Sequence, residues 1–598
     1  GIIKFFEEIA NYSGGRLGEV ANVTKPVDLK VLRAVNGEYA VPSAQNVESE
    51  EFEGAKVFDP VVGILDNVLV LDLASLYPMS MKTVNAGPET KDPEGELKAP
   101  NGIRFSNEED AVVVDLVNEM LKKRQKYKDL RDSHDPDSDA YDRFDRKQAA
   151  VKVTMNTLYG VMGWDRFRLQ DKDVGAAVTA VGREVIKFTD QVVQDMGYES
   201  VYGDTDSVMI QLGDVSTDIL EDDDAIQTVL DRHDVDSIGE MREYVRSTHD
   251  GMSESEIDQH IAILGVGFQV EERINDEYDQ FAKEELNADE HFFDIEFEKL
   301  YRKFFQAGKK KRYAGHITWK EGKEKDDVDI VGFEYTRSDY SVAAKNLMQR
   351  VFQHALKGGD LQDIHEEVTS TIEKLKNEEF DPDVFGIPSS VSQDFDEYES
   401  MTPGVKGSMY ANEHFDAGIQ PGDKPKMCYV DKVLPNEDGE KEYPMPDPDP
   451  EKTQSCCWIN YDDIPDVVVW DWDEYIENQI KGPIKRILIG TDWSWGEIIT
   501  GERQPRLNEY DTEAVNEGET NVMEIDDGVD EELNDGFQEE KMMPWERQRM
   551  EARKQLDRTQ DMLEGWDETE PDGGEVIEAT METNDTEDDG PKTLDDYV

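Results

Sequence analysis

The stretch SVYGDTDSVMIQL, residues 200–212, decides the fold because it joins a strand pattern to a pair of carboxylates. Residue types alternate on both sides of its centre, which predicts two antiparallel strands around a tight acidic turn. Asp204 and Asp206 stand two positions apart, so on a strand they share one face and their carboxylates converge. Like charges that close raise each other's proton affinity unless a cation neutralises them. The stretch therefore predicts a metal-binding hairpin, or else a solvated Asp-x-Asp turn in an acid-rich chain.

Another carboxylate stands near the end of a buried strand upstream. Residues 67–73, NVLVLDL, are apolar and β-branched, which is typical of such a strand, and they include Asp72. A carboxylate at a strand terminus can project into a cleft and bind a divalent cation through oxygen. The alternative is an Asp that caps the helical turn behind it.

A helix pattern between these segments carries a cation, an amide and an aromatic ring on one face. In KVTMNTLYG, residues 152–160, the three side chains recur at i, i+4 and i+7. They are Lys152, Asn156 and Tyr159. Arg124 and Lys128 share a face of an earlier helix pattern in the same way. The two helices would together suit a ligand with phosphate, sugar and base, or they are two ordinary solvated helix faces.

In this order, the three segments resemble the polymerase motifs of family B DNA polymerases, whose patterns are DxxSLYPS, KxxxNSxYG and YGDTDS. The chain has DLASLYPM (72–79), KVTMNTLYG (152–160) and YGDTDS (202–207). Met79 and Thr157 depart from the family's serines, and neither position is a metal or triphosphate ligand in the family. Flanking segments resemble the family as well. They are FEGAKVFDPVVG (52–63), KKRQKYK (122–128), KKRYAG (310–315), VGFEYTRSD (331–339) and WDEYIENQIKGPIKRIL (472–488).

The resemblance implies a two-metal nucleotidyl transfer from a dNTP to a primer 3′-OH, with release of pyrophosphate. Two Mg²⁺ ions would be held by Asp72, Asp206 and the Leu73 carbonyl, with Asp204 as the assisting acid. Lys152 is the expected general acid towards pyrophosphate. The expected nucleotide-binding residues are Ser75, Leu76, Tyr77, Arg124, Lys128, Lys152, Asn156, Tyr159 and Gly160. Those expected on the primer–template DNA are Lys310, Lys311, Arg312, Tyr313 and Gly315.

The implied fold is α+β, the right-hand polymerase, with an antiparallel-sheet palm, helical fingers, a mostly helical thumb and a disordered acidic C-terminal tail. The expected domains are palm over 1–107, fingers over 108–162, palm again over 163–320, thumb over 321–500 and tail over 501–598. Residues 214–262 are acid-rich and are expected to form a surface excursion within the second palm segment. From the residue patterns we expect helices over 108–131, 145–162 and 175–196, and mostly helices after residue 337.

The charge of the chain excludes a basic protein that coats nucleic acid. The 598 residues carry 64 Lys and Arg against 137 Asp and Glu, a net charge of −73. The last 98 residues hold only 24 of these net negative charges, so the folded part is acidic too. Such self-repulsion is tolerable where molar salt screens it. A high-salt cytoplasm with nucleoid association is the expected location, and an ordinary acidic protein with a disordered tail is the alternative.

Other features bound the interpretation. No apolar run is long enough to span a membrane, and three cysteines give neither a disulfide framework nor a zinc pattern.

FDIE at 293–296 copies an exonuclease motif, but its position favours a segment near the thumb. The DLASLYPM motif stands so early, at residues 72–79, that we expect an amino-terminally truncated chain without proofreading. The non-enzymatic alternative is a non-catalytic or truncated polymerase-fold paralogue that binds DNA.

The C-terminus predicts a partner. PKTLDDYV, residues 591–598, places Leu594, Tyr597 and Val598 at the spacing of a sliding-clamp-binding peptide, although Pro591 replaces the usual Gln. A clamp hook on an acidic tether would raise the effective concentration of the chain at a clamp. A terminus without function is the alternative.

Overall fold

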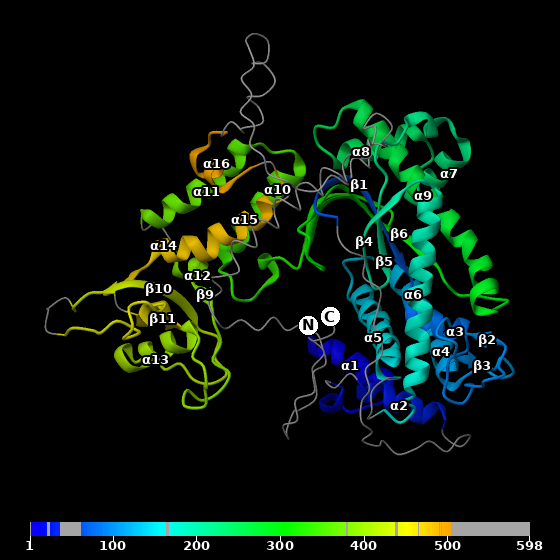
Figure 1. The fold of residues 1–598 in the computed structure, drawn as a ribbon, viewed down its shortest axis with the longest axis horizontal. Helices are drawn as coiled ribbons and strands as arrows, with labels where there is room; N and C mark the ends of the chain where they lie inside the picture. The colour runs from blue at the N-terminus through cyan, green and yellow to red at the C-terminus, as the bar shows by residue number, and fades with distance from the viewer. Residues whose placement is uncertain are drawn as a thin grey trace, which may run out of the picture.

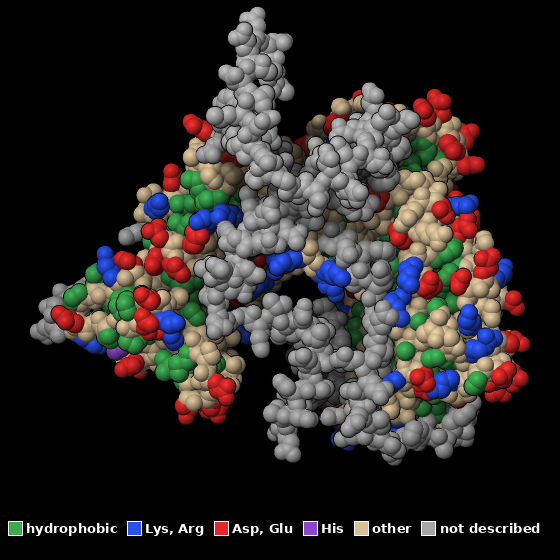
Figure 2. Space-filling view, viewed as in Figure 1, with side chains coloured by type: hydrophobic (Ala, Val, Ile, Leu, Met, Phe, Trp, Pro, Cys, Tyr) green, Lys and Arg blue, Asp and Glu red, His purple; other side chains and the backbone are tan. Residues whose placement is uncertain are grey.

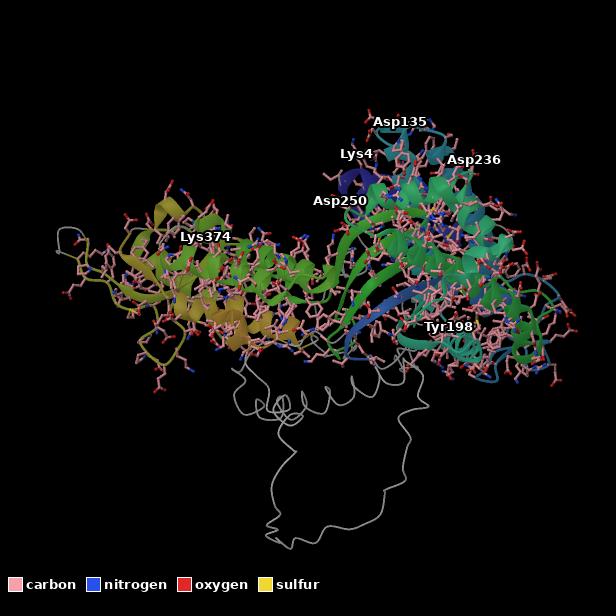
Figure 3. The ribbon with its side chains drawn as sticks, turned by 90° about the horizontal axis from the view of Figure 1, so that it is seen from above. Lys4, Asp135, Tyr198, Asp236, Asp250 and Lys374 are labelled. Carbon is pink, nitrogen blue, oxygen red and sulfur yellow. The ribbon has the colours of Figure 1, made fainter. Side chains whose placement is uncertain are left out.

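The computed structural model describes residues 2–20, 24–35, 61–162, 167–377, 381–436, 441–464, 466–489, 491 and 493–503. These residues form two lobes side by side, which Figures 1 and 3 show from two directions. In Figure 3, Asp236, Asp250 and Tyr198 lie on the larger lobe and Lys374 lies on the smaller one. Within the described residues, no helix combines the length and the apolar character that crossing a membrane would need.

A six-stranded antiparallel sheet is the frame of the larger lobe. Its strands, in spatial order, are β4 (Glu199–Asp204), β5 (Ser207–Gln211), β1 (Gly63–Leu73), β6 (Ile295–Gln306), β7 (Tyr313–Lys320) and β8 (Lys323–Val331). β4 and β5 form the hairpin predicted around the YGDTDS turn, and β1 is the predicted buried strand. The sheet continues to Val331, past residue 320, where the sequence analysis placed a domain boundary.

The alternation of β1 explains why its sequence is apolar on both faces. Leu69 and Leu71 belong to the main core, whereas Val68 and Val70 belong to a smaller cluster that includes residues of β4, β5 and β6. Neighbouring residues of a strand point to opposite faces, so both faces of β1 are covered. α6 packs against β4, and α9 against β6 (Figure 1). A strand this well covered fixes its register, and therefore the position of Asp72.

Helices complete the larger lobe. They are α1 (Ile2–Ser13), α2 (Thr24–Ala34), α3 (Leu76–Thr83), α4 (Val112–Asp132), α5 (Asp139–Met162), α6 (Lys172–Asp195), α7 (Asp223–His233), α8 (Ile238–Thr248) and α9 (Glu254–Leu286), with 3₁₀ turns at Leu17–Glu19 and Thr217–Glu221 and a small hairpin of β2 (Leu97–Lys98) and β3 (Arg104–Phe105). α4, α5 and α6 confirm the three predicted helices. α4 and α5 pack against each other as a helical hairpin. α5 begins six residues earlier than predicted, within the polar turn region.

The acid-rich stretch 214–262 was expected to form a surface excursion, and it also contributes side chains to the core. It contains α7, α8 and the start of α9, and the apolar faces of these helices join the main core. Val229, Met241 and Val245 are fully buried there. The composition of the stretch is acidic because its outer faces are, while its inner faces keep the helical period.

The smaller lobe combines helices with a second sheet. Its helices are α10 (Val342–Lys357), α11 (Leu361–Lys376), α12 (Pro382–Phe385), α13 (Pro403–Phe415), α14 (Trp472–Tyr475), α15 (Gly482–Leu488) and α16 (Trp495–Thr500), with a π-helical turn at Ile476–Lys481 and 3₁₀ turns at Glu334–Thr336 and Tyr461–Asp463. Its strands are β9 (Ile387–Pro388), β10 (Lys426–Val433), β11 (Ser455–Trp458) and β12 (Val468–Trp470). Mostly helices were expected here, and this sheet was not predicted; three of its strands, β9, β11 and β12, have only two to four residues. Cys428, Cys456 and Cys457 are buried and free.

Candidate active site

A pocket of about 930 Å³ opens where the sheet of the larger lobe meets the α4–α5 hairpin. Ten of the residues singled out from the sequence line it. They are Asp72, Ser75, Leu76, Tyr77, Arg124, Lys128, Lys152, Asn156, Tyr159 and Asp206. They come from four segments of the chain, 72–77, 124–128, 152–159 and 206, which the fold brings together in one pocket.

The acidic wall of the pocket is built by strand pairing. Asp72 on β1 stands opposite Ser207 on β5 and Glu296 on β6. The Leu73 N–H donates a hydrogen bond of 2.8 Å to the Asp206 carbonyl, which ties the two strands together at the turn. Thr205 adopts a left-handed conformation, with φ of 64°, at the tip of that turn. The register therefore places the Asp72 and Asp206 carboxylates on one wall.

The two carboxylates hold their protons more tightly than usual. Burial, and then the charge of Asp206, raises the pKa of Asp72 to about 7. Burial is also the main reason that the pKa of Asp206 is raised. The positive charge of Lys152 lowers both pKa values but does not offset burial, and a divalent cation beside the carboxylates would favour their charged form.

The opposite wall of the pocket is basic. Arg124 and Lys128 project from α4, and Lys152 projects from α5. Burial, followed by the positive charge of Arg124, lowers the pKa of Lys128. The Arg124 side chain is held by a hydrogen bond of 3.4 Å from its Nε to Gln148 Oε1. Three positively charged side chains this close together suit an anion, because phosphate oxygens between them would relieve their mutual repulsion.

Two stacked tyrosines form the floor between the walls. The rings of Tyr77 and Tyr159 lie 4.1 Å apart with 12° between their planes. Gly182 on α6 leaves room for Tyr77, since a Cβ there would lie 3.2 Å from the Tyr77 ring. Burial raises the pKa of Tyr77 to about 12, so its hydroxyl stays protonated. A flat, rigid aromatic surface of this kind suits packing against a sugar or a base.

Three of the predicted residues lie outside the lining of the pocket. Leu73 is buried, and the backbone contact to Asp206 is its link to the site. Asp204 stands beside the pocket, and Lys311 Nζ lies 3.8 Å from its Oδ1. Gly160 is exposed on α5, and a Cβ there would meet no atom within 4 Å.

The predicted DNA-binding segment divides into exposed and packed residues. Lys310 and Lys311 are exposed in the β6–β7 turn. Arg312 lies 3.8 Å from the buried carboxylate of Glu334, which Arg486 also approaches at 2.8 Å. Packing requires a glycine at position 315, because a Cβ there would lie 2.2 Å from the Tyr301 ring. The ring of Tyr313 lies 5.9 Å from that of Tyr202 on β4.

Sequence reasoning missed two acids of the pocket, Glu296 and Glu298. The FDIE segment that contains Glu296 leads into β6, which pairs with β1 so that Glu296 stands opposite Asp72. The alternation in DIEFE, residues 294–298, was the signal that these carboxylates share a strand face. Burial raises the pKa of Glu296, as it does for Asp72.

The sheet, the paired acids and the facing basic helices form a pocket of the kind found in enzymes that act on phosphate groups. Comparison with known proteins shows which family of these enzymes the chain belongs to. The family model described as DNA polymerase family B matches residues 27–221 and 253–488, and the chain belongs to this family. The motif residues of the pocket all lie inside the matched ranges.

Individual relatives agree with the family. The chain is 27% identical over 440 residues to "DNA polymerase 2" of Aeropyrum pernix, which covers 72% of this chain and 46% of that protein. It is also 27% identical over 461 residues to a DNA polymerase of Archaeoglobus fulgidus, covering 76% of this chain and 49% of the relative. The "DNA polymerase delta catalytic subunit" of Glycine max matches over 482 residues at 27% identity, covering 76% of this chain and 38% of the relative. The chain thus spans half or less of the length of these relatives.

A solved structure shares the fold. The family B DNA polymerase of Pyrobaculum calidifontis superposes with a TM-score of 0.53 at 23% sequence identity, over 82% of this chain and 54% of that one. The α+β architecture, with an antiparallel sheet and surrounding helices, is therefore that of a family B polymerase.

Proposed function

We propose that this chain synthesises DNA on a template by transferring a nucleotidyl group from a dNTP to a primer 3′-OH, with release of pyrophosphate. The observation that supports this most directly is the meeting of the Asp72 and Asp206 wall with the Arg124, Lys128 and Lys152 wall in one pocket. A substrate with a triphosphate needs both walls: cations for its phosphate oxygens, and carboxylates for the metal ions that accompany it.

The acidic wall fits magnesium. Asp72 and Asp206 offer oxygen donors, which Mg²⁺ prefers, and burial raises the pKa of both carboxylates, so a bound cation would stabilise their charged form. In the proposed site, Asp72, Asp206 and the Leu73 carbonyl would hold two Mg²⁺ ions. When bound, these ions would make the primer 3′-OH more acidic and neutralise charge on the leaving pyrophosphate.

The basic wall binds and orients the triphosphate in this proposal. Arg124 and Lys128 hold its oxygens, and Asn156 lies one helical turn beyond Lys152 on α5. Lys152, exposed in the open pocket, donates a proton to pyrophosphate as it leaves. Electrostatic stabilisation of this kind is largest where charge develops during the reaction.

The aromatic floor selects the sugar. Tyr77, held against Tyr159, would lie under the deoxyribose, where a 2′-hydroxyl would collide with the ring. The 2′-hydroxyl is the group that distinguishes RNA from DNA precursors. Gly160, with open space above it, would leave room for the nascent base pair.

Primer–template DNA would lie between the lobes. Lys and Arg side chains border the opening between the lobes in Figure 2, whereas Asp and Glu side chains dominate the outer faces. Lys310 and Lys311 extend into solvent from the β6–β7 turn, next to Asp204 of the YGDTDS motif. Phosphate contacts require such local patches and not a basic chain, which reconciles DNA binding with the net charge of −73.

Primer extension tests the proposal directly. The purified chain, with Mg²⁺ at high KCl, should extend a labelled primer, and Asp206→Ala should abolish extension. Asp66→Ala is the matched control, because Asp66 lies on β1 with Asp72 but at the other end of the strand. If the wild-type chain binds primer–template but does not extend it, the chain is the non-catalytic paralogue instead.

We also propose that the C-terminus binds a sliding clamp. The terminal segment lies outside the described residues, and the spacing of Leu594, Tyr597 and Val598 supports the proposal. Deleting residues 594–598 should remove stimulation by a clamp while leaving clamp-free primer extension unchanged. Equal stimulation of both chains would contradict it.

A further inference from the structure

A second cluster of ligating side chains lies buried behind the active-site pocket. His249 follows α8, His260 lies on α9 and Glu324 lies on β8. All three are buried, and one donor atom from each falls within 4.8 Å of the others. Nothing in the proposed polymerase chemistry uses them.

The contacts within the cluster leave one carboxylate oxygen unpaired. His249 Nε2 and His260 Nε2 lie 2.8 Å and 2.9 Å from the same atom, Glu324 Oε2. Glu324 Oε1 has no hydrogen-bond partner among the described residues, although the Glu324 side chain is 0% exposed. A buried carboxylate oxygen without a partner is costly, so a hydrogen-bonded cluster alone is a poor account of this arrangement.

A third histidine is close but already engaged. His233 Nδ1 lies 2.6 Å from the Val229 carbonyl, and its Nε2 accepts a hydrogen bond of 2.8 Å from Trp319 Nε1. Both contacts of His233 are satisfied when its Nδ1–H donates to the Val229 carbonyl and its Nε2 accepts from Trp319. Its Nε2 therefore has no proton to donate to Glu324 Oε1, which lies 3.6 Å away.

We propose that His249, His260 and Glu324 bind one divalent transition-metal ion of the zinc class. Two imidazole nitrogens and a carboxylate suit Zn²⁺, Co²⁺ or Ni²⁺, whereas Mg²⁺ prefers oxygen ligands alone. Tetrahedral zinc bonds of about 2.0–2.1 Å set donor atoms roughly 3.3 Å apart, so the observed 2.8 Å and 2.9 Å need open only slightly. The ion would also bind Glu324 Oε1, or a water beside it.

The cluster lies next to a cavity on one side and to the wall of the active-site pocket on the other. His260 lines a cavity of about 290 Å³, together with Thr318, whose buried hydroxyl also lacks a hydrogen-bond partner among the described residues. Glu324 pairs across the sheet with Trp319, which lines the active-site pocket, as does the β7–β8 turn at Glu321. The ion would thus join α8 and α9 to the sheet edge that forms one side of the pocket.

Cobalt titration tests the site independently of polymerase activity. The full chain, stripped with chelator and returned to high KCl with excess Mg²⁺ to occupy oxygen sites, should bind one Co²⁺ with the intense visible absorption of a four- or five-coordinate nitrogen site. Zn²⁺ should displace it and raise the thermal unfolding midpoint. His249→Gln and His260→Gln should weaken binding by about 100-fold or more.

His316→Gln is the matched control, because His316 is also buried and carboxylate-paired, 2.6 Å from Asp326 Oδ1, but lies outside the cluster. Its Co²⁺ affinity should equal that of the wild-type chain. Absence of tight Co²⁺ or Zn²⁺ binding by the wild-type chain would overturn the proposal, and so would equal affinity in His249→Gln. The wild-type titration stands alone if a variant fails to fold.

Discussion

Asp72 is a carboxylate that the fold keeps partly from water, so its ionisation is coupled to folding. Its pKa of about 7 in the folded chain compares with about 3.9 for an unfolded Asp. Between these values the folded chain holds a proton that the unfolded chain has lost, so the contribution of Asp72 to stability falls as pH rises from about 4 to about 7. In metal-free buffer, Asp72→Asn should therefore gain stability over the wild type, by about 1–2 kcal/mol above pH 7 after allowance for solvent screening.

Denaturant unfolding with chelator at several pH values measures this difference. Asp137→Asn is the control, since Asp137 is exposed in the α4–α5 loop. Adding Mg²⁺ should stabilise the wild type and leave Asp72→Asn nearly unchanged. A difference between the two chains that does not grow with pH would contradict the proposed environment of Asp72.

Alanine variants of two glycines in the predicted site distinguish a glycine needed for packing from one needed for nucleotide incorporation. Gly160→Ala should leave stability unchanged or raise it by about 0.5–1 kcal/mol, because the position is helical and open. Gly315→Ala should lose about 1–3 kcal/mol through collision with the Tyr301 ring. Thermal unfolding ranks the two variants. If Gly160 makes room for a base pair, Gly160→Ala should nevertheless slow nucleotide incorporation, and a normal rate would reject that role.

At the scale of elements, α5 presents one lysine to the pocket and another away from it. Lys152→Met should lower the maximal rate of single-nucleotide incorporation by about 10²–10³, because it removes a charge that acts on the leaving group. Lys147→Met should change the rate little, since Lys147 Nζ lies over the Tyr127 and Phe144 rings, 5.6 Å and 5.8 Å from their centroids. Rapid-quench measurements at saturating dNTP make the comparison. Equal rates in the two variants would remove Lys152 from the mechanism.

Comparing the observed helices and strands with those expected shows which of them the sequence could predict. β1, the β4–β5 hairpin and α4–α6 followed from local periodicity, and the order of the three motifs pointed to one pocket. Glu298 was missed because its place depends on the pairing of β6 with β1, a contact made across more than 200 residues. The cluster of His249, His260 and Glu324 has the same cause, since three separate elements supply its ligands. β11 and β12, of four and three residues, are too short to show a period.

For the whole molecule, salt acts on folding and on DNA binding in opposite directions. The net charge of −73 destabilises the compact state in dilute buffer, and molar KCl shortens the Debye length to about 3 Å. The free energy of unfolding should therefore rise steadily from about 0.1 M to molar KCl. Affinity for DNA should fall over the same range, because phosphate contacts weaken as counterions become concentrated.

Neutralising exposed acids should relieve the need for salt without touching the pocket. Glu272, Asp276 and Glu285 are exposed on α9, and no ion-pair partner is found for them within the described residues. The triple variant Glu272→Gln, Asp276→Asn, Glu285→Gln should need less KCl to reach a given thermal midpoint, since it removes like charges, two of them one helical turn apart. Primer extension at saturating DNA should peak at high KCl in the wild-type chain. A peak below about 0.1 M, with steady decline above it, would mean that the acidic surface has another purpose.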